Sequence, residues 1–236
     1  MKNFFDKHLL EIAIVLGVIF LLVTGNQAAA APKLPNDAPV YVPVLVNEID
    51  TYWADMQYRE FLAGLVEQES NWKIKATLKH EREFGCGFGQ FTKTFNKDGS
   101  IRFDTLTETK RLDKSLAAWN WEDCYNAKFQ LRAMLLKVKV NERSCKVWMD
   151  DSLDIKRCDG SAYNGGLGGF SKRMRLCRAQ AGCDPRKWEG HLSLQCAASN
   201  VKQVGYGESF CQINSKYPGR IISRMEKYKP YMVKKP

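Results

Sequence analysis

One glutamate of this chain has a setting suited to acid–base chemistry. Apolar residues precede it at the spacing of an amphipathic helix: Phe61, Leu62, Leu65 and Val66. At about 100° per residue, Glu69 falls near the middle of this stripe, whereas Glu60 and Glu67 fall on the opposite face. Burial among apolar groups disfavours the charged carboxylate and raises its pKa toward that of a working general acid. Glu69 is therefore the candidate catalytic residue, and the alternative is a glutamate at a helix end, paired with a lysine.

Two glycine-rich stretches follow Glu69 and could form the walls of a binding site. The first has alternating glycines and ends in a glutamine and a phenylalanine: Gly85, Gly87, Gly89, Gln90 and Phe91. Alternating glycines permit backbone torsions and close approaches that side chains prevent. This stretch lacks the Lys-Ser/Thr ending of a phosphate-binding loop and follows the charged residues 80–83 rather than an apolar strand. This stretch is therefore not predicted to be a nucleotide-binding loop.

The second stretch, residues 161–169, is predicted to be a glycine-rich turn that carries Tyr163 and Asn164. Asparagine tolerates left-handed torsions, so Asn164 also fits a simple turn position. Structural alternatives exist for two other candidates as well. Ser70 could cap a helix, and Phe91 could belong to the core.

Helices are the main elements predicted to position these groups. The apolar pattern indicates helices from Val46 to Ser70, over 125–140, and in a last segment that ends before Pro230, whose apolar stripe includes Tyr217. Residues 97–100 form a turn signal between two short strand-like segments, which predicts a β-hairpin. The expected fold class is mainly α (α+β), with a small β-hairpin and disulfide bonds.

The N-terminus carries an export signal. Residues 12–23 form an apolar run too short to span a bilayer comfortably, and four alanines follow at 28–31. We predict a signal peptide over 1–30, and the alternative is a membrane anchor attached through residues 9–25. The proline-rich residues 31–46 are predicted to be an extended linker, and residues 230–236 a basic tail.

Cysteine usage agrees with export. The eight cysteines all follow the apolar run: Cys86, Cys124, Cys145, Cys158, Cys177, Cys183, Cys196 and Cys211. An even number suits an oxidising compartment, and we expect up to four disulfides, whose connectivity the sequence does not define. There is no C-x-x-C motif, and only His80 and His191 follow the export signal. The acidic residues 150–154 also lack the spacing of a calcium loop. We therefore expect no metal and no cofactor.

The composition fits a folded, basic domain. The chain is 44% hydrophobic, contains six tryptophans and has a formal net charge of +10. Such a charge favours a polyanionic partner, which could be nucleic acid, an anionic membrane surface or an acidic cell-wall polymer. The charges are dispersed and are not interleaved with aromatic residues, and the chain has an export signal. We therefore expect no nucleic-acid partner.

Three groups in this order resemble the catalytic domain of lytic transglycosylases related to goose-type lysozyme: Glu69-Ser70, Gly87-Phe88-Gly89-Gln90-Phe91 and Ala162-Tyr163-Asn164-Gly165-Gly166. The resemblance covers residues 47–229 and includes Glu208, which precedes the last predicted helix. The chain departs from the family pattern in its charged run at 80–83, in Gly89 where a bulkier residue is usual, and in its eight cysteines. These departures bear on the shape of the groove.

The resemblance implies a lysozyme-like domain that acts on the glycan strand of peptidoglycan, between N-acetylmuramic acid and N-acetylglucosamine. Glu69 would protonate the glycosidic oxygen and then accept the proton of the muramyl 6-hydroxyl, which closes a 1,6-anhydro ring. Because that nucleophile belongs to the substrate, no second carboxylate is required. The enzyme would be an exported monomer in the periplasm or cell envelope, or anchored in the inner membrane.

The resemblance also implies roles for the other site residues. Ser70 would orient Glu69 or the substrate, and Gln90 and Phe91 would line the sugar groove. The reacting sugar would be steadied by Tyr163 and Asn164, and Glu208 would also belong to the substrate-binding set.

Two other functions remain open at this point. If Glu81, Glu83 or Asp104 reaches the groove and positions a water molecule, the same fold would be a hydrolytic muramidase. The second alternative is an exported wall-binding protein without catalysis.

Overall fold

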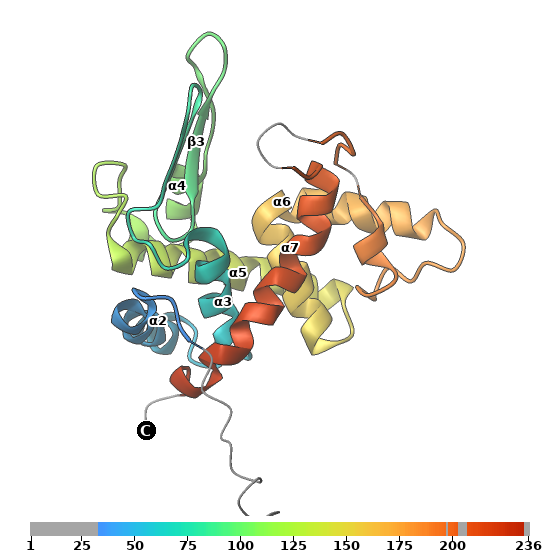
Figure 1. Cartoon of the computed structure of the whole chain (residues 1–236), viewed down its shortest axis with the longest axis horizontal. Coiled ribbons are helices and arrows are strands. Elements are labelled where there is room, and N and C mark those ends of the chain that lie inside the picture. Colours follow the sequence, from blue (N-terminus) through green and yellow to red (C-terminus); the bar gives the residue numbers. More distant parts are fainter. Residues whose placement is uncertain (1–32, 197, 203–206, 234–236) are drawn as a thin grey trace, which may run out of the picture. The chain divides into compact units, whose positions relative to one another are not determined.

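The computed structural model describes residues 33–196, 198–202 and 207–233. The predicted signal peptide or anchor over 1–30, including the attachment segment 9–25, lies outside the described residues. Figure 1 shows the elements in chain order: α2(Ala38–Tyr52), α3(Glu60–Ser70), β1(Thr77–His80), β2(Glu83–Cys86), β3(Phe91–Phe95), β4(Ile101–Asp104), α4(Thr105–Lys110), η1(Lys114–Leu116), α5(Ala127–Trp148), α6(Ser152–Arg178), η2(Leu192–Leu194), α7(Phe210–Met225) and η3(Glu226–Tyr231). In the described ranges, none of the helices combines the length and apolar character needed to cross a membrane.

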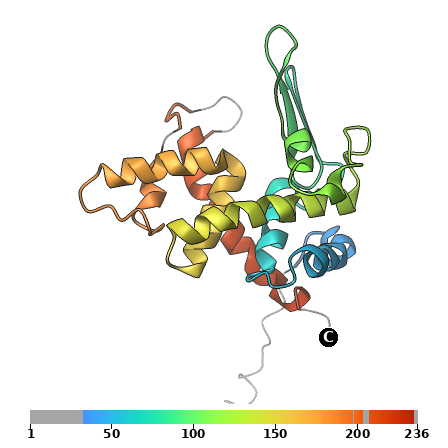
Figure 2. The ribbon, with the colours of Figure 1, turned by 180° about the vertical axis from the view of Figure 1, so that it is seen from behind.

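The predicted mainly helical α+β class is confirmed. Helix α3 packs against α7, α5 against both α2 and α6, and α6 against α7. Seen from behind in Figure 2, α5 runs from the foot of the sheet across to α6. The N-terminal half of α3 is buried on all sides, because Phe61 to Val66 are all inaccessible to solvent. Asn71, with a left-handed φ of 51°, ends α3 one residue after Ser70.

The β region is larger than the single predicted hairpin. Four antiparallel strands pair in the order β1-β2-β3-β4. The predicted hairpin corresponds to β3 and β4, and its turn is held by Asp98, whose Oδ1 accepts a hydrogen bond from the amide of Ser100 at 3.0 Å. The charged run at 80–83 lies at the tip of the first hairpin, with Glu81 and Arg82 exposed between β1 and β2.

The predicted extended linker over 31–46 is wrong from Ala38 onward, where α2 begins. Pro39 is tolerated because the N–H groups of the first turn have no partner within the helix. Pro43 lies inside the helix, where a proline destabilises by roughly 3 kcal/mol. Burial offsets this penalty, since Leu45 and Ile49 are completely buried and each stabilises by about 1.5–3 kcal/mol.

The predicted turn at 161–169 is also wrong, because these residues belong to the long helix α6. The helix is kinked at Gly166, which has φ 73° and ψ 157°. A left-handed φ is easily adopted by glycine, so the chain can bend at one residue and continue as a helix. Phe170 and Met174 are buried beyond the kink and hold the second half of α6 in place.

Three disulfides form among the described residues: Cys145–Cys158, Cys177–Cys183 and Cys196–Cys211. The first joins the end of α5 to α6, and the third joins the segment after η2 to the start of α7. Cys86 and Cys124 are buried free thiols. Burial and a hydrogen bond to Cys124 raise the pKa of the Cys86 thiol well above its usual range. Of the up to four disulfides expected, the structure therefore contains three, and the remaining two cysteines are free.

Candidate active site

Glu69 lies in the last turn of α3, partly buried. Tyr217 of α7 donates a hydrogen bond from its hydroxyl to Oε1 of Glu69. Burial raises the pKa of Glu69 to about 7, against the opposing effects of the Tyr217 hydrogen bond and the positive charge of Lys137. A carboxyl group with this pKa is substantially protonated near neutral pH, so it can donate a proton there.

A close helix crossing brings Tyr217 to Glu69. A Cβ atom added to Gly64 of α3 would lie 2.8 Å from the carbonyl oxygen of Ile221 in α7. Only glycine permits this approach, because any side chain at position 64 would push the two backbones apart. Tyr217 lies one turn before Ile221 on the same face of α7, and it is therefore buried against the end of α3.

Glu69 opens onto a pocket of about 310 Å³ between the helices and the sheet. Four other predicted site residues line the same pocket: Gln90, Phe91, Tyr163 and Asn164. The remaining lining residues are Glu83, Gly89, Thr92, Phe103, Thr105 and Lys137. The three sequence motifs, which span nearly one hundred residues of chain, thus meet around one carboxyl group.

Close contacts around Gly89 fix the wall that carries Gln90 and Phe91. Tyr163 donates a hydrogen bond to the carbonyl oxygen of Gly89 at 3.1 Å. A Cβ atom at position 89 would lie 2.8 Å from the Tyr163 hydroxyl and 2.7 Å from the ring of Phe91. A side chain at position 89 would therefore force Tyr163, Phe91 or Met134 to shift, which fits the small residue at a position where the resembled family has a larger one.

Gln90 is held in an uncommon conformation at the corner of the pocket. Its φ is 46°, and its side-chain amide donates hydrogen bonds to the carbonyl oxygens of Gly87 at 2.8 Å and Ala76 at 3.3 Å. Both acceptors belong to the hairpin region, so the side chain of Gln90 also closes the loop between β2 and β3. The uncommon backbone conformation of Gln90 costs free energy, and these two hydrogen bonds help to hold it.

Lys137 of α5 is a pocket residue that was not predicted. Its ammonium group lies 4.3 Å from the centre of the Tyr163 ring. Burial lowers the pKa of Lys137, and the negative charge of Glu69 opposes this shift. One signal in the sequence could have identified it, because Lys137 lies four residues after Ala133 and beside Leu136, on the apolar face predicted for this helix.

Two predicted residues lie outside the pocket. Ser70 is buried, and its hydroxyl donates a hydrogen bond to the carbonyl oxygen of Val66 at 3.0 Å within α3. Glu208 precedes α7 and forms ion pairs with Lys216 at 2.5 Å and Arg220 at 2.9 Å. Their contacts support the end of α3 and the start of α7, respectively.

The pocket contains a second carboxylate, that of Glu83 on β2. Of the three acidic residues considered for water activation, Asp104 instead accepts hydrogen bonds from Trp121 at 3.0 Å and from the backbone of Thr107 at 2.9 Å. Glu81 is exposed at the hairpin tip. Glu83 is therefore the acid that could face a substrate together with Glu69.

Comparisons with known proteins add nothing to this geometry. A scan against protein-family models and a search of curated proteins both found no match for the chain.

Proposed function

We propose that the chain is an exported peptidoglycan lytic transglycosylase with a lysozyme-like catalytic domain. It would cleave the β-1,4 bond between N-acetylmuramic acid and N-acetylglucosamine. One observation carries this proposal: Glu69, with its pKa raised to about 7 and its carboxyl group held by Tyr217, opens onto the pocket that the other two motifs line.

In the first step, the protonated carboxyl of Glu69 donates its proton to the glycosidic oxygen as the bond to C1 of the muramyl residue breaks. The developing positive charge on the sugar faces the carboxylate that forms. Lys137 and the Tyr217 hydroxyl both favour the ionised form of Glu69, so they stabilise the product of this proton transfer. Glu69 serves as the general acid here.

In the second step, the muramyl 6-hydroxyl attacks C1 and the Glu69 carboxylate accepts its proton. This step forms the 1,6-anhydro ring and regenerates the protonated acid, so no water is consumed. An intramolecular nucleophile needs no separate base or covalent intermediate. A single carboxyl with a pKa close to the working pH can serve both steps.

The pocket walls would hold the reacting sugar. Tyr163 is fixed by its hydrogen bond to Gly89, and Asn164 donates a hydrogen bond to Asn214 of α7. Gln90 and Phe91 form the opposite edge beside the sheet. Because these side chains are held by packing and hydrogen bonds before substrate binds, little ordering is needed on binding.

Glu83 supports a second candidate function, the hydrolysis of the same bond. If its carboxylate activates a water molecule on the far side of the sugar ring, the products would carry reducing ends. The distinction is measurable by mass, because transglycosylation gives products one water lighter than hydrolysis. A Glu83→Gln variant that still releases anhydro products supports transglycosylation. Reducing products that disappear in Glu83→Gln support hydrolysis.

The proposal that the protein is exported is supported by its disulfides. Structural disulfides are typical of oxidising compartments, and three form within the described residues. The expected site of action is the periplasm or cell envelope, and the partner is the glycan strand itself. The direct test of the whole proposal is digestion of purified peptidoglycan followed by mass analysis of the released fragments. Intact peptidoglycan after prolonged incubation would contradict it.

A further inference from the structure

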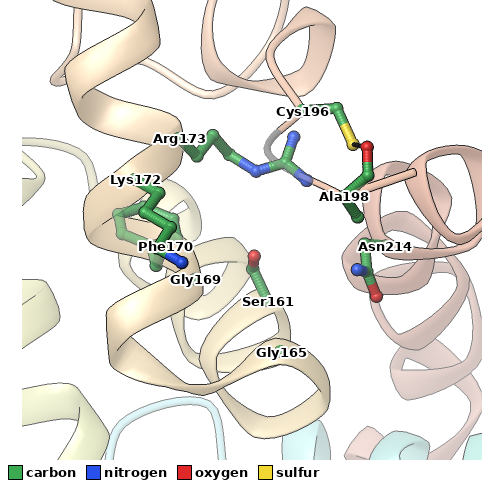
Figure 3. Close-up of a pocket in the computed structure, with 9 residues that line it drawn as sticks. All are labelled: Ser161, Gly165, Gly169, Phe170, Lys172, Arg173, Cys196, Ala198 and Asn214. Carbon is green, nitrogen blue, oxygen red and sulfur yellow. Dashed lines mark hydrogen bonds between the residues drawn. The ribbon is translucent and has the colours of Figure 1, made fainter. Parts of the chain in front are cut away.

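A second pocket lies beside the catalytic one, between α6 and α7 (Figure 3). It has a volume of about 160 Å³, enough for a small anionic group. Its polar lining consists of Ser161, Lys172, Arg173 and Asn214, and its lining includes no acidic residue. Figure 3 shows the guanidinium group of Arg173 extending from α6 toward Cys196 and Ala198 across this space.

Arg173 is a buried cation to which the described part of the chain supplies no counter-charge. Its side chain packs over the ring of Trp188, and the residue is only 3% exposed. Nη1 donates hydrogen bonds to the carbonyl oxygen of Leu192 at 2.8 Å and the hydroxyl of Ser215 at 3.2 Å. Within the described ranges, no aspartate or glutamate forms an ion pair with it. Burial lowers the pKa of Arg173 to about 10.

The two other cations that are buried to a similar degree among the described residues, Lys156 and Arg59, are paired with acids, as is the half-buried Arg132. Lys156 forms an ion pair with Asp159 at 3.1 Å, and Arg132 with Glu48 at 2.8 Å. Arg59 is paired with Asp50. A buried charge is costly unless it is neutralised by a partner. Arg173 thus differs from these cations because it lacks a negatively charged partner, and a bound anion would supply one.

The pocket is open because glycines form part of its wall. Gly165 and Gly169 line it, and a Cβ atom added to either would meet no other atom within 4 Å. Gly169 lies one helical turn before Arg173 on the same face of α6. Because these two positions carry no side chain, space remains in the pocket beside Arg173.

The two pockets share a wall. Asn164 lines the catalytic pocket, while the next residue, Gly165, lines the second one. Asn164 also donates a hydrogen bond to Asn214, which lines the second pocket. A muramyl residue held at Glu69 would carry its peptide stem, which contains carboxylates, close to this boundary.

We propose that the second pocket binds a carboxylate of the peptide stem carried by the muramyl residue, with Arg173 as its principal partner. This inference rests on the proposed function, since it assigns the substrate of the same site. It makes the enzyme selective for glycan strands that still carry their peptides. Lys172 is exposed at the rim and adds positive charge to the entrance.

A binding experiment tests the pocket independently of catalysis. The probe is N-acetylmuramyl-L-alanyl-D-glutamate, and its uncharged diamide is the matched ligand, both titrated against the full chain. A charge-assisted hydrogen bond predicts about tenfold tighter binding of the dicarboxylate. Equal affinities for the two ligands would overturn the proposal.

Position 169 offers a variant that leaves Arg173 in place. In Gly169→Asp, a carboxylate one turn before Arg173 would occupy the pocket and pair with the guanidinium group. This variant is expected to lose the preference for the dicarboxylate, while the isosteric Gly169→Asn keeps it. A Gly169→Asp variant that retained the preference would place the anion elsewhere and overturn the inference.

Turnover separates a failure of this inference from a failure of the proposed function. On peptide-bearing strands, Gly169→Asp is expected to raise KM about tenfold without changing kcat. On strands stripped of their peptides, it should match wild type. If wild type cleaves both substrates and Gly169→Asp cleaves both equally well, the inference fails alone. If wild type cleaves neither substrate, the proposed function fails, and the ligand titration decides whether the anion site exists.

Discussion

The hydroxyl of Tyr217 donates a hydrogen bond to Oε1 of Glu69, although 148 positions separate the two residues in the chain. The bond depends on Gly64, where α3 and α7 approach too closely for any side chain. It links a carboxyl group on one helix to the packing of another. The position and the proton affinity of Glu69 therefore both depend on the α3–α7 contact.

Tyr217→Phe is expected to reduce kcat about tenfold, because the Glu69 carboxyl loses a charge-assisted hydrogen bond that orients it. The same bond lowers the pKa of Glu69, so its removal should move the alkaline limb of the pH–rate profile to higher pH. Steady-state rates on peptidoglycan fragments across the pH range measure both effects. A variant with unchanged kcat and an unchanged limb would show that the hydrogen bond has no catalytic role.

Lys137→Met should also raise the pKa of Glu69, since the positive charge of Lys137 lowers it in the wild type. The alkaline limb of kcat/KM is therefore expected to move to higher pH, while the rate at acidic pH changes little. Lys128→Met provides the control, because Lys128 is exposed on the same helix and does not line the pocket. Identical profiles for the two variants would contradict an electrostatic role for Lys137.

Gly89→Ala tests the wall formed by the glycine cluster. The added methyl group would press on Tyr163 and Phe91, so we expect a loss of about 1–3 kcal/mol in the free energy of unfolding together with reduced turnover. Gly168→Ala is the matched control, because a Cβ atom there meets nothing within 4 Å. Equal denaturation midpoints for the two variants would show that position 89 tolerates a side chain.

Glu69 should destabilise the folded protein at alkaline pH. Its pKa is raised from 4.5 to about 7 on folding, so the wild type loses stability as the pH rises through this interval. Glu69→Gln does not titrate and escapes this loss. The advantage of the variant in unfolding free energy should therefore increase by about 2–3 kcal/mol between pH ~4 and pH ~8.5. Denaturant titrations at both pH values measure it, and parallel behaviour of variant and wild type would contradict a raised pKa.

Local patterns were sufficient to predict several parts of the molecule. The helix that ends at Ser70 follows from its apolar spacing, and this spacing alone distinguishes Glu69 from Glu60. The hairpin of β3 and β4 follows from its turn residues. The sequence motifs that resemble one family also contain four residues that the structure brings to Glu69: Gln90, Phe91, Tyr163 and Asn164.

Other parts depend on contacts that no local pattern contains. Tyr217 and Lys137 lie on the apolar faces predicted for their helices, but only the packing of α7 and α5 brings them to Glu69. The first half of helix α2 was missed because its two prolines indicated an extended linker, although the buried residues recur at helical spacing. The turn expected at 161–169 was wrong because a single residue, Gly166, provides the bend that the glycine-rich composition suggested for the whole stretch.

The central claim is that Glu69 is the acid and base of a peptidoglycan-cleaving reaction. It is tested most directly by comparing wild type, Glu69→Gln and Glu60→Gln on purified peptidoglycan, with the released fragments weighed by mass spectrometry. Glu60 begins the same helix and does not line the pocket, so it controls for the chemical change. We predict that wild type and Glu60→Gln release anhydro fragments at similar rates and that Glu69→Gln releases none. Fragment release by Glu69→Gln at the wild-type rate would contradict the account.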